Sequence, residues 1–168
     1  MSQECGRFSW LRRWFVFSCI LLVAISAVWA VPAWADNYTK ESLVNQDFSG
    51  QNLKDSTFTK ANLISSNFSN TDLRGVSLFG ANLEDANLSG SDLRYATLDL
   101  ARFVKTNLTN ARLEGAFAYN AQFQGATIEG ADFTDVDLRS DAQALLCKIA
   151  KGTNPTTGRQ TRKTLNCA

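Results

Sequence analysis

The sequence contains no histidine, only two prolines and one methionine among its 168 residues. Histidine is the usual general base and the commonest metal ligand, so its absence disfavours two large classes of catalytic site. Charge is nearly balanced, with 17 basic and 16 acidic residues, whereas nucleic-acid-binding proteins normally carry a clear positive excess. No phosphate-binding loop, zinc motif or nucleophile motif occurs. We therefore expect neither enzymatic activity nor a bound cofactor, metal or nucleic acid.

The first 35 residues have the pattern of an export signal. Three arginines precede an apolar run over about residues 14–31, and the run is followed by Ala33-Trp34-Ala35. This small-x-small ending is typical of a signal peptidase site, so we predict that residues 1–35 are a cleavable signal peptide. The alternative is a retained membrane anchor, because the run is nearly long enough to span a bilayer. The pair Arg12-Arg13 fits a twin-arginine signal and an ordinary basic n-region about equally well.

Removal of residues 1–35 changes the charge and the cysteine count. It takes three of the 17 basic residues and one of the 16 acidic ones, which leaves 14 and 15. It also takes two of the four cysteines and leaves Cys147 and Cys167. An even number of cysteines in an exported protein predicts one disulfide bond.

The remainder of the chain is dominated by a five-residue period. A large apolar residue recurs every five positions from residue 43 to residue 138, a spacing that matches neither the 3.6 of a helix nor the 2 of a strand. Nineteen of the twenty centres are Leu, Phe or Ile, and the exception is Ala118. The large centres are Leu43, Phe48, Leu53, Phe58, Leu63, Phe68, Leu73, Leu78, Leu83, Leu88, Leu93, Leu98, Phe103, Leu108, Leu113, Phe123, Ile128, Phe133 and Leu138.

Each position of the unit has a physical reason. The centre supplies buried apolar area, worth roughly 1.5–3 kcal/mol per side chain. The residue two before it is small, because a second large group has no room in the same interior. Gly or Asn is common two after the centre, where a corner requires a tight or left-handed backbone. A single unit buries nothing alone, so the units must stack as a solenoid.

The pattern A-[D/N]-L-x-x resembles the pentapeptide-repeat proteins. It is seen in Ala81-Asn82-Leu83, Ala86-Asn87-Leu88 and Ala131-Asp132-Phe133, and the resemblance covers residues 41–140. The family implies an all-β solenoid, a right-handed quadrilateral β-helix with four pentapeptides per coil and about five coils here. Centres 20 residues apart then stack on one face. Leu43 begins the first face, Phe48 the second, Leu53 the third and Phe58 the fourth.

The C-terminal segment has no five-residue phase and is predicted to cap the solenoid. We expect residues 36–140 to form the β-helix and residues 141–168 a helix-and-loop cap tied by Cys147 and Cys167. The helix is expected over about residues 141–150 and the tail as a loop. The tail, including Asn154-Pro155-Thr156-Thr157-Gly158, resembles the cap of lumenal pentapeptide-repeat proteins of cyanobacteria and plastids. That resemblance implies the thylakoid lumen or the periplasm of a cyanobacterium-like cell.

Two other motifs are better explained by the repeat and its solvent-facing positions than by a glycosylation site or a calcium site. Asn67, Asn87 and Asn107 match the glycosylation pattern, but the repeat itself places Asn before a centre and often Ser or Thr after it. Asp132, Asp135 and Asp137 are close in sequence but lack the spacing of a calcium loop. Residues 36–42 show no cap, so the protein is expected to be a monomer or a dimer through this end. A membrane is expected to be contacted only through the uncleaved signal.

The leading functional prediction is a non-catalytic scaffold that binds an unknown protein partner. A solenoid offers an extended rigid surface without an active-site pocket. Apolar residues at outward positions supply a possible partner patch. They are Phe79, Tyr95, Leu100, Phe117 and Tyr119.

Two alternatives remain open. The first is a redox-active lumenal factor that uses Cys147 and Cys167. The second is a DNA mimic that binds topoisomerases, as some members of the family do. The repeat body carries 13 acidic and 8 basic residues, but Lys54, Arg74 and Arg94 interrupt any acidic column. An export signal also separates the protein from DNA.

Ala118 is the one small centre, and it predicts a void between Leu98 and Leu138. Either an aromatic neighbour turns inward to fill it, or Phe117 and Tyr119 both stay outside and the void remains. We expect Phe117 to turn inward and fill part of it; if it stays outside, it belongs to the partner patch.

Overall fold

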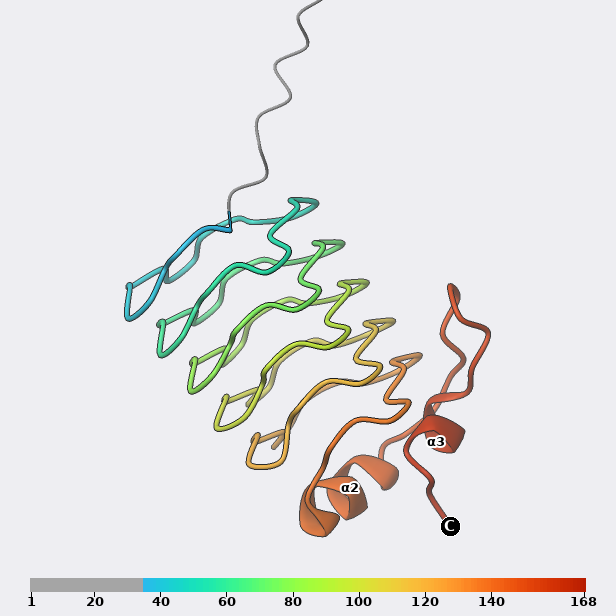
Figure 1. Cartoon of the computed structure of the whole chain (residues 1–168). Coiled ribbons are helices and arrows are strands. Elements are labelled where there is room, and N and C mark those ends of the chain that lie inside the picture. The colour runs from blue at the N-terminus through green and yellow to red at the C-terminus, as the bar shows by residue number, and fades with distance from the viewer. Residues whose placement is uncertain (1–34) are drawn as a thin grey trace, which may run out of the picture. The chain divides into compact units, whose positions relative to one another are not determined.

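The computed structural model describes residues 35–168 (Figure 1). The predicted signal peptide lies, except for Ala35, outside the described residues. From residue 37 to residue 137 the chain winds as a β-helix, in which parallel bridges join residues 20 positions apart. The bridges run from Asn37–Thr57 to Phe117–Asp137, so four pentapeptides make each coil. Neither helix in this part of the chain has the length and apolar character needed to cross a membrane.

The sides of the solenoid are shorter than ordinary strands. Within residues 35–168 each side contributes isolated single-residue bridges and no extended strand. The reason is the turn that follows every centre except Leu138. The C=O of Leu63, for example, accepts the N–H of Ser66 at 3.1 Å, and Ser65 between them has φ 57°. This is the geometry of a type II turn, with a left-handed residue at its third position.

Asparagine before the centre has two structural roles. The Oδ1 atom of Asn67 accepts the backbone N–H of Ser69 at 3.1 Å, which fixes the start of the corner. The Nδ2 group of Asn87 donates to Asn67 Oδ1 at 3.2 Å, and that of Asn107 donates to Asn87 Oδ1 at 3.3 Å. The asparagines of the glycosylation pattern therefore form a hydrogen-bonded ladder along the second face.

The core consists of the stacked centres and the small residues two before them. All the large centres are buried except Leu43 and Leu138, which are half-buried in the first and last coils. At the N-terminal end the rings of Tyr38 and Phe58 stack with centroids 4.6 Å apart, and those of Phe48 and Phe68 stack at 4.8 Å. Aromatic packing thus fills the end of the solenoid that has no predicted cap.

The cap contains two short helices, α2 (Ser140–Cys147) and α3 (Thr161–Thr164). Helix α2 begins and ends earlier than the predicted residues 141–150, and α3 lies in a tail that was predicted to be a loop. Cys147 and Cys167 form the predicted disulfide bond, with their Cα atoms 5.6 Å apart. The bond joins the end of α2 to the segment that follows α3.

Asn154 attaches the tail to the last coils. Its side chain is fully buried, and its Nδ2 group donates to Gly130 O at 2.9 Å and to Asn110 O at 3.1 Å. Its Oδ1 atom accepts the backbone N–H groups of Thr156 and Thr157, each at 3.0 Å. One side chain therefore pairs solenoid carbonyls and at the same time closes its own turn.

Candidate functional site

The candidate site is an apolar patch on the outward side of the fourth face. Side chains just before, one after and two after a centre point to solvent, because the centre and the small residue occupy the interior. Exposed fractions are 62% for Tyr95, 50% for Leu100, 56% for Phe117 and 51% for Tyr119. Phe79, the fifth predicted member, is half-buried. These five residues are called the fourth-face patch below.

The prediction for Phe117 is wrong in direction. Phe117 points outward, and Ala118 is completely buried without it. The backbone explains this outcome. Phe117 N–H donates to Ala96 O at 2.9 Å, and Phe117 O accepts the N–H of Leu98 at 2.7 Å. A bridge to each side, to Thr97 and to Asp137, fixes the peptide so that the side chain at this position faces solvent.

Tyr95 extends along the surface toward the next coil. It has φ 59°, an unusual conformation for a bulky residue, at the corner that precedes the fourth face. A Cβ atom placed on Gly115 would lie 2.8 Å from both Cδ1 and Cε1 of the Tyr95 ring. One edge of the ring therefore lies against Gly115, and there is room for it because glycine has no side chain. The arrangement presents an aromatic ring at the surface in a defined orientation.

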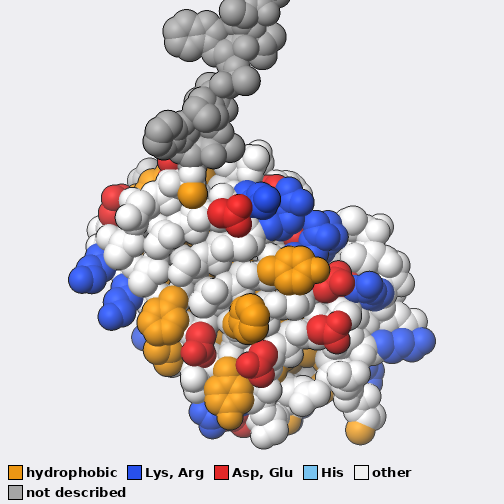
Figure 2. Space-filling view, viewed as in Figure 1, with side chains coloured by type: hydrophobic (Ala, Val, Ile, Leu, Met, Phe, Trp, Pro, Cys, Tyr) orange, Lys and Arg blue, Asp and Glu red, His pale blue; other side chains and the backbone are white. Residues whose placement is uncertain are grey.

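Acidic residues accompany the patch. Asp99 stands between Phe79 and Tyr119 in one column, and its Oδ1 atom accepts the N–H of Asn120 at 2.8 Å. Asp137 follows Phe117 across a bridge and is exposed. In Figure 2 hydrophobic and acidic side chains are interspersed over the middle of the visible surface. A surface of this kind is complementary to a segment that is both apolar and basic.

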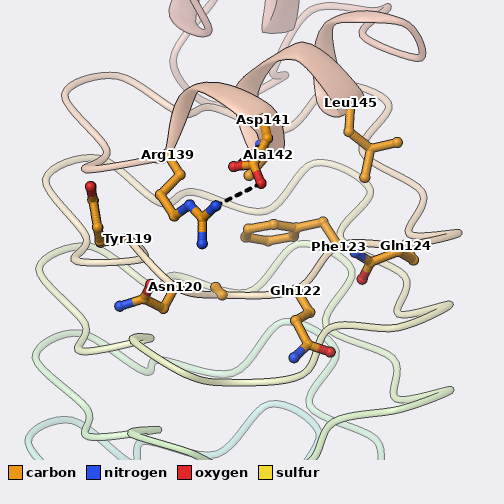
Figure 3. A pocket seen from close by; sticks show the side chains of 10 residues that line it. Tyr119, Asn120, Gln122, Phe123, Gln124, Arg139, Asp141, Ala142 and Leu145 are labelled. Atoms are coloured by element: carbon orange, nitrogen blue, oxygen red, sulfur yellow. Dashed lines mark hydrogen bonds and ion pairs between the residues drawn. The ribbon is translucent and has the colours of Figure 1, made fainter.

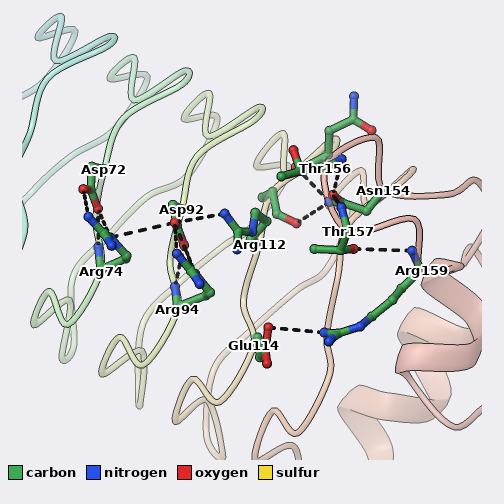
Figure 4. A network of polar contacts seen from close by, with 12 residues as sticks. Asp72, Arg74, Asp92, Arg94, Arg112, Glu114, Asn154, Thr156, Thr157 and Arg159 are labelled. Carbon is green, nitrogen blue, oxygen red and sulfur yellow. Dashed lines mark hydrogen bonds and ion pairs between the residues drawn. The ribbon is translucent and has the colours of Figure 1, made fainter.

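The third face carries a ladder of alternating charges (Figure 4). Asp92 accepts from Arg94 at 2.8 Å and from Arg112 of the next coil at 3.3 Å. A hydrogen bond from Arg74 holds the pKa of Asp72 below its ordinary value, despite partial burial. Arginines and aspartates thus neutralise each other along this face. No continuous acidic column, which a DNA mimic requires, runs along it.

The ladder ends at the cap. Arg159 of the tail lies 3.2 Å from Glu114 and 3.4 Å from the buried carboxylate of Asp132. Burial raises the pKa of Asp132, but hydrogen bonds from Thr134 and the charge of Arg159 outweigh it, so the pKa lies below its ordinary value. Asp132 is therefore part of the cap attachment. Within residues 35–168 no group of three His, Cys, Asp or Glu residues is placed to hold a metal ion.

Comparison with known proteins identifies the repeat. The family model of pentapeptide repeats matches residues 43–80, 72–110 and 101–139. A solved pentapeptide repeat protein from the thylakoid lumen of Arabidopsis thaliana is 49% identical, with a TM-score of 0.76. The match covers 77% of this chain and 90% of that one.

Two curated proteins of the same plant match over shorter segments. Thylakoid lumenal 15 kDa protein 1 of the chloroplast is 58% identical over 48 residues, which are 29% of this chain and 21% of that protein. Thylakoid lumenal protein TL20.3 is 56% identical over 43 residues, which are 26% of this chain and 15% of that protein. These alignments span about a fifth or less of the curated relatives' own lengths.

Proposed function

The chain belongs to the pentapeptide-repeat family, and we propose that it is a non-catalytic solenoid that binds a protein partner in an exported compartment, the thylakoid lumen or an equivalent periplasmic space. Right-handed quadrilateral β-helices of this family are rigid supports for surface residues. The lumenal relatives of Arabidopsis thaliana support the location.

The observation that carries the proposal is the concentration of exposed apolar residues on one face. Tyr95, Leu100, Phe117 and Tyr119 account for four of the five exposed large hydrophobic side chains in residues 35–168, and the fifth is Ile149 of the cap. Aromatic residues on a rigid support bind with little loss of conformational entropy and are enriched at protein interfaces. The surrounding acids favour a partner segment with basic residues.

A quantitative capture experiment tests the proposal. Mature protein is immobilised and incubated with soluble extract of its native compartment, and retained proteins are quantified by mass spectrometry. The double variant Phe117→Ser/Tyr119→Ser should lose at least one retained protein by about tenfold, a change of about 1.4 kcal/mol. The matched control is Val104→Ser, at an outward position of the first face, and it should retain that protein. Equal retention by all three proteins would refute an interaction through the fourth-face patch.

The redox alternative predicts a different behaviour of the same protein. A redox factor exchanges its disulfide with a substrate, whereas a structural bond only stabilises the fold. The bond between Cys147 and Cys167 joins two parts of the cap, which favours the structural role. Dimerisation through the N-terminal end is a further proposal, which sedimentation of the mature protein tests.

A further inference from the structure

The last coil leaves part of its first face without backbone partners. One coil earlier, Phe103 N–H bonds to Gln122 O at 2.7 Å, Lys105 N–H bonds to Gln124 O at 2.9 Å and Ala101 O accepts from Gln122 N–H at 3.0 Å. The equivalent groups of the last coil are Phe123 N–H, Gly125 N–H and Ala121 C=O. None of the three has a hydrogen-bond partner among residues 35–168. Phe123 is only 1% exposed, and unpaired buried N–H groups are rare in proteins.

The cap protects the neighbouring faces better. On the second face Gly130 N–H donates to Lys151 O at 2.9 Å. On the third face Phe133 N–H donates to Thr164 Oγ1 at 3.1 Å. The fourth face continues directly into α2. Among the first three faces, the first is therefore the one on which all three ladder groups of the final coil stay open, in the described part of the chain.

A cleft lies between this open edge and α2 (Figure 3). Its volume is about 440 Å³, within the range of peptide-sized and ligand-sized sites. One wall consists of residues 119–124 of the last coil, and Ala142 and Leu145 of α2 form the other. At its margin Arg139 pairs with Asp141 at 3.0 Å, and both side chains are more than half exposed. The lining is mixed: Asn120, Gln122 and Gln124 contribute polar side chains on the side of the last coil, and Ala142 and Leu145 contribute apolar ones on the side of α2.

We infer that this cleft binds an extended segment of the partner, which adds to the first face as one more strand. The inference rests on the proposed function, because the segment belongs to the protein that binds the fourth-face patch. The open groups, one C=O and two N–H, repeat the pattern by which every earlier coil bonds to its successor. An extended backbone can satisfy all three, whereas a helix, whose backbone groups are paired internally, cannot.

The cleft and the patch are continuous, which restricts the chemistry of the segment. Tyr119 lines the cleft and is also a member of the fourth-face patch. A segment paired with residues 121–125 therefore passes next to Tyr119, Phe117 and the carboxylate of Asp137. We expect it to have no proline at its paired positions, and to carry apolar and basic residues on the side that reaches the patch.

A linear dodecapeptide display library, selected on the mature oxidised protein, is the probe. An enriched peptide is synthesised and titrated into isotope-labelled wild-type protein. The amide protons of Phe123 and Gly125 should move downfield and exchange more slowly with solvent, as new hydrogen bonds form. Proline at the central position of the peptide should abolish these changes. Failure to enrich any peptide, or shifts that avoid residues 121–125, would overturn the inference.

Two variants of α2 test whether the peptide binds in the cleft or elsewhere on the cap. Ala142→Trp fills the cleft and should weaken peptide binding by at least about tenfold, or 1.4 kcal/mol. Ala144→Trp on the exposed side of the same helix should bind within about twofold of wild type. Equal binding by both variants contradicts the inference. The spectra of the wild-type complex decide the matter if Ala142→Trp does not fold.

The two proposals fail separately. If Phe117→Ser/Tyr119→Ser loses partner capture and Ala142→Trp does not, the inference about the cleft is refuted and the proposed function stands. If none of the variants changes partner capture, both proposals are refuted. A dimer that forms through the cleft in sedimentation would identify the occupant as a second copy and overturn the partner assignment.

Discussion

At the scale of single residues, place within the five-residue unit decides the direction of a side chain. Phe117 occupies the position before the centre, where its peptide bonds to both neighbouring coils, so it cannot turn inward without breaking that ladder. The five-residue spacing identified which residues are buried. The same spacing places Phe117 outside. The expectation that Phe117 turns inward rested on side-chain volume alone, whereas backbone hydrogen bonds fix its direction.

The exposed position of Phe117 makes Ala118→Leu a test of the core. With Phe117 outside, no aromatic ring competes for the space between Leu98 and Leu138. The larger side chain should bury additional methylene groups and raise the free energy of unfolding by about 1–2 kcal/mol. Thermal and denaturant unfolding measure the change. A lower midpoint would mean that the core is already closed around Ala118 and is overpacked by leucine.

Asp132 gives the cap a dependence on pH. Its folded-state pKa is lowered, so its carboxylate stabilises the protein fully above the unfolded pKa of about 3.9, and this contribution is lost as pH falls through the folded value. Asp132→Asn should therefore lower the free energy of unfolding by about 1 kcal/mol at neutral pH, and the difference should begin to shrink below about pH 4 and close once the pH is below the folded value. Asp135→Asn, at an exposed corner, is the matched control. A difference that does not change with pH would mean that the charge of Asp132 is not what stabilises the cap.

At the scale of elements, the sequence predicted the solenoid and a capping helix but not how the cap is attached. The repeat is local and periodic, so each coil could be predicted from its neighbours. Attachment depends on contacts over long sequence separations, such as Asn154 with Asn110 and Arg159 with Glu114. Helix α3 was missed because four residues are too few for a periodic signal. The segment around Asn154 was predicted only to be a loop, and the structure shows that its side chain hydrogen-bonds to carbonyls of the solenoid.

Asn154 is the clearest test of that attachment. Asn154→Ala removes the donor that pairs carbonyls of Gly130 and Asn110, and it leaves those buried groups unsatisfied. We expect a loss of about 2–3 kcal/mol in the free energy of unfolding. Hydrogen exchange should accelerate first in the tail. The neighbouring exposed Thr156→Ala should change stability little, because Thr156 contributes only its backbone N–H to the turn. A neutral Asn154→Ala would show that the other contacts of the cap, such as those of Arg159 and Thr164, are sufficient to hold it.

Reduction of the disulfide tests its structural role. The bond between Cys147 and Cys167 closes a loop with a sequence separation of 20 residues. Its removal should lower the free energy of unfolding by roughly 3 kcal/mol in the chain-entropy model. Thiol labelling of the denatured, unreduced protein should find no free cysteine after the signal has been removed. Rapid, reversible exchange with glutathione and no loss of stability would instead favour the redox role.

At the scale of the whole molecule, the residues that make the solenoid rigid are different from those that face solvent. The centres and the asparagine ladder make a rigid body, and the outward positions then vary freely without affecting it. The apolar composition of the patch was predictable because the period assigns each residue to the inside or the outside. The orientation of Tyr95 against Gly115 was not, because it depends on a contact between coils. The same holds for the open edge at residues 121–125, which the shape of the cap creates.

The central claim is that the fourth-face patch contacts a protein partner in the native compartment. Its most direct measurement is site-specific photo-crosslinking in the living cell, with a photoreactive phenylalanine analogue at Tyr119 or, as control, at the exposed Asp85 on another corner of the solenoid. The account predicts a discrete crosslinked product from position 119 that is absent from position 85 and is lost on Phe117→Ser. Products that are absent from position 119, or identical from both positions, would contradict it.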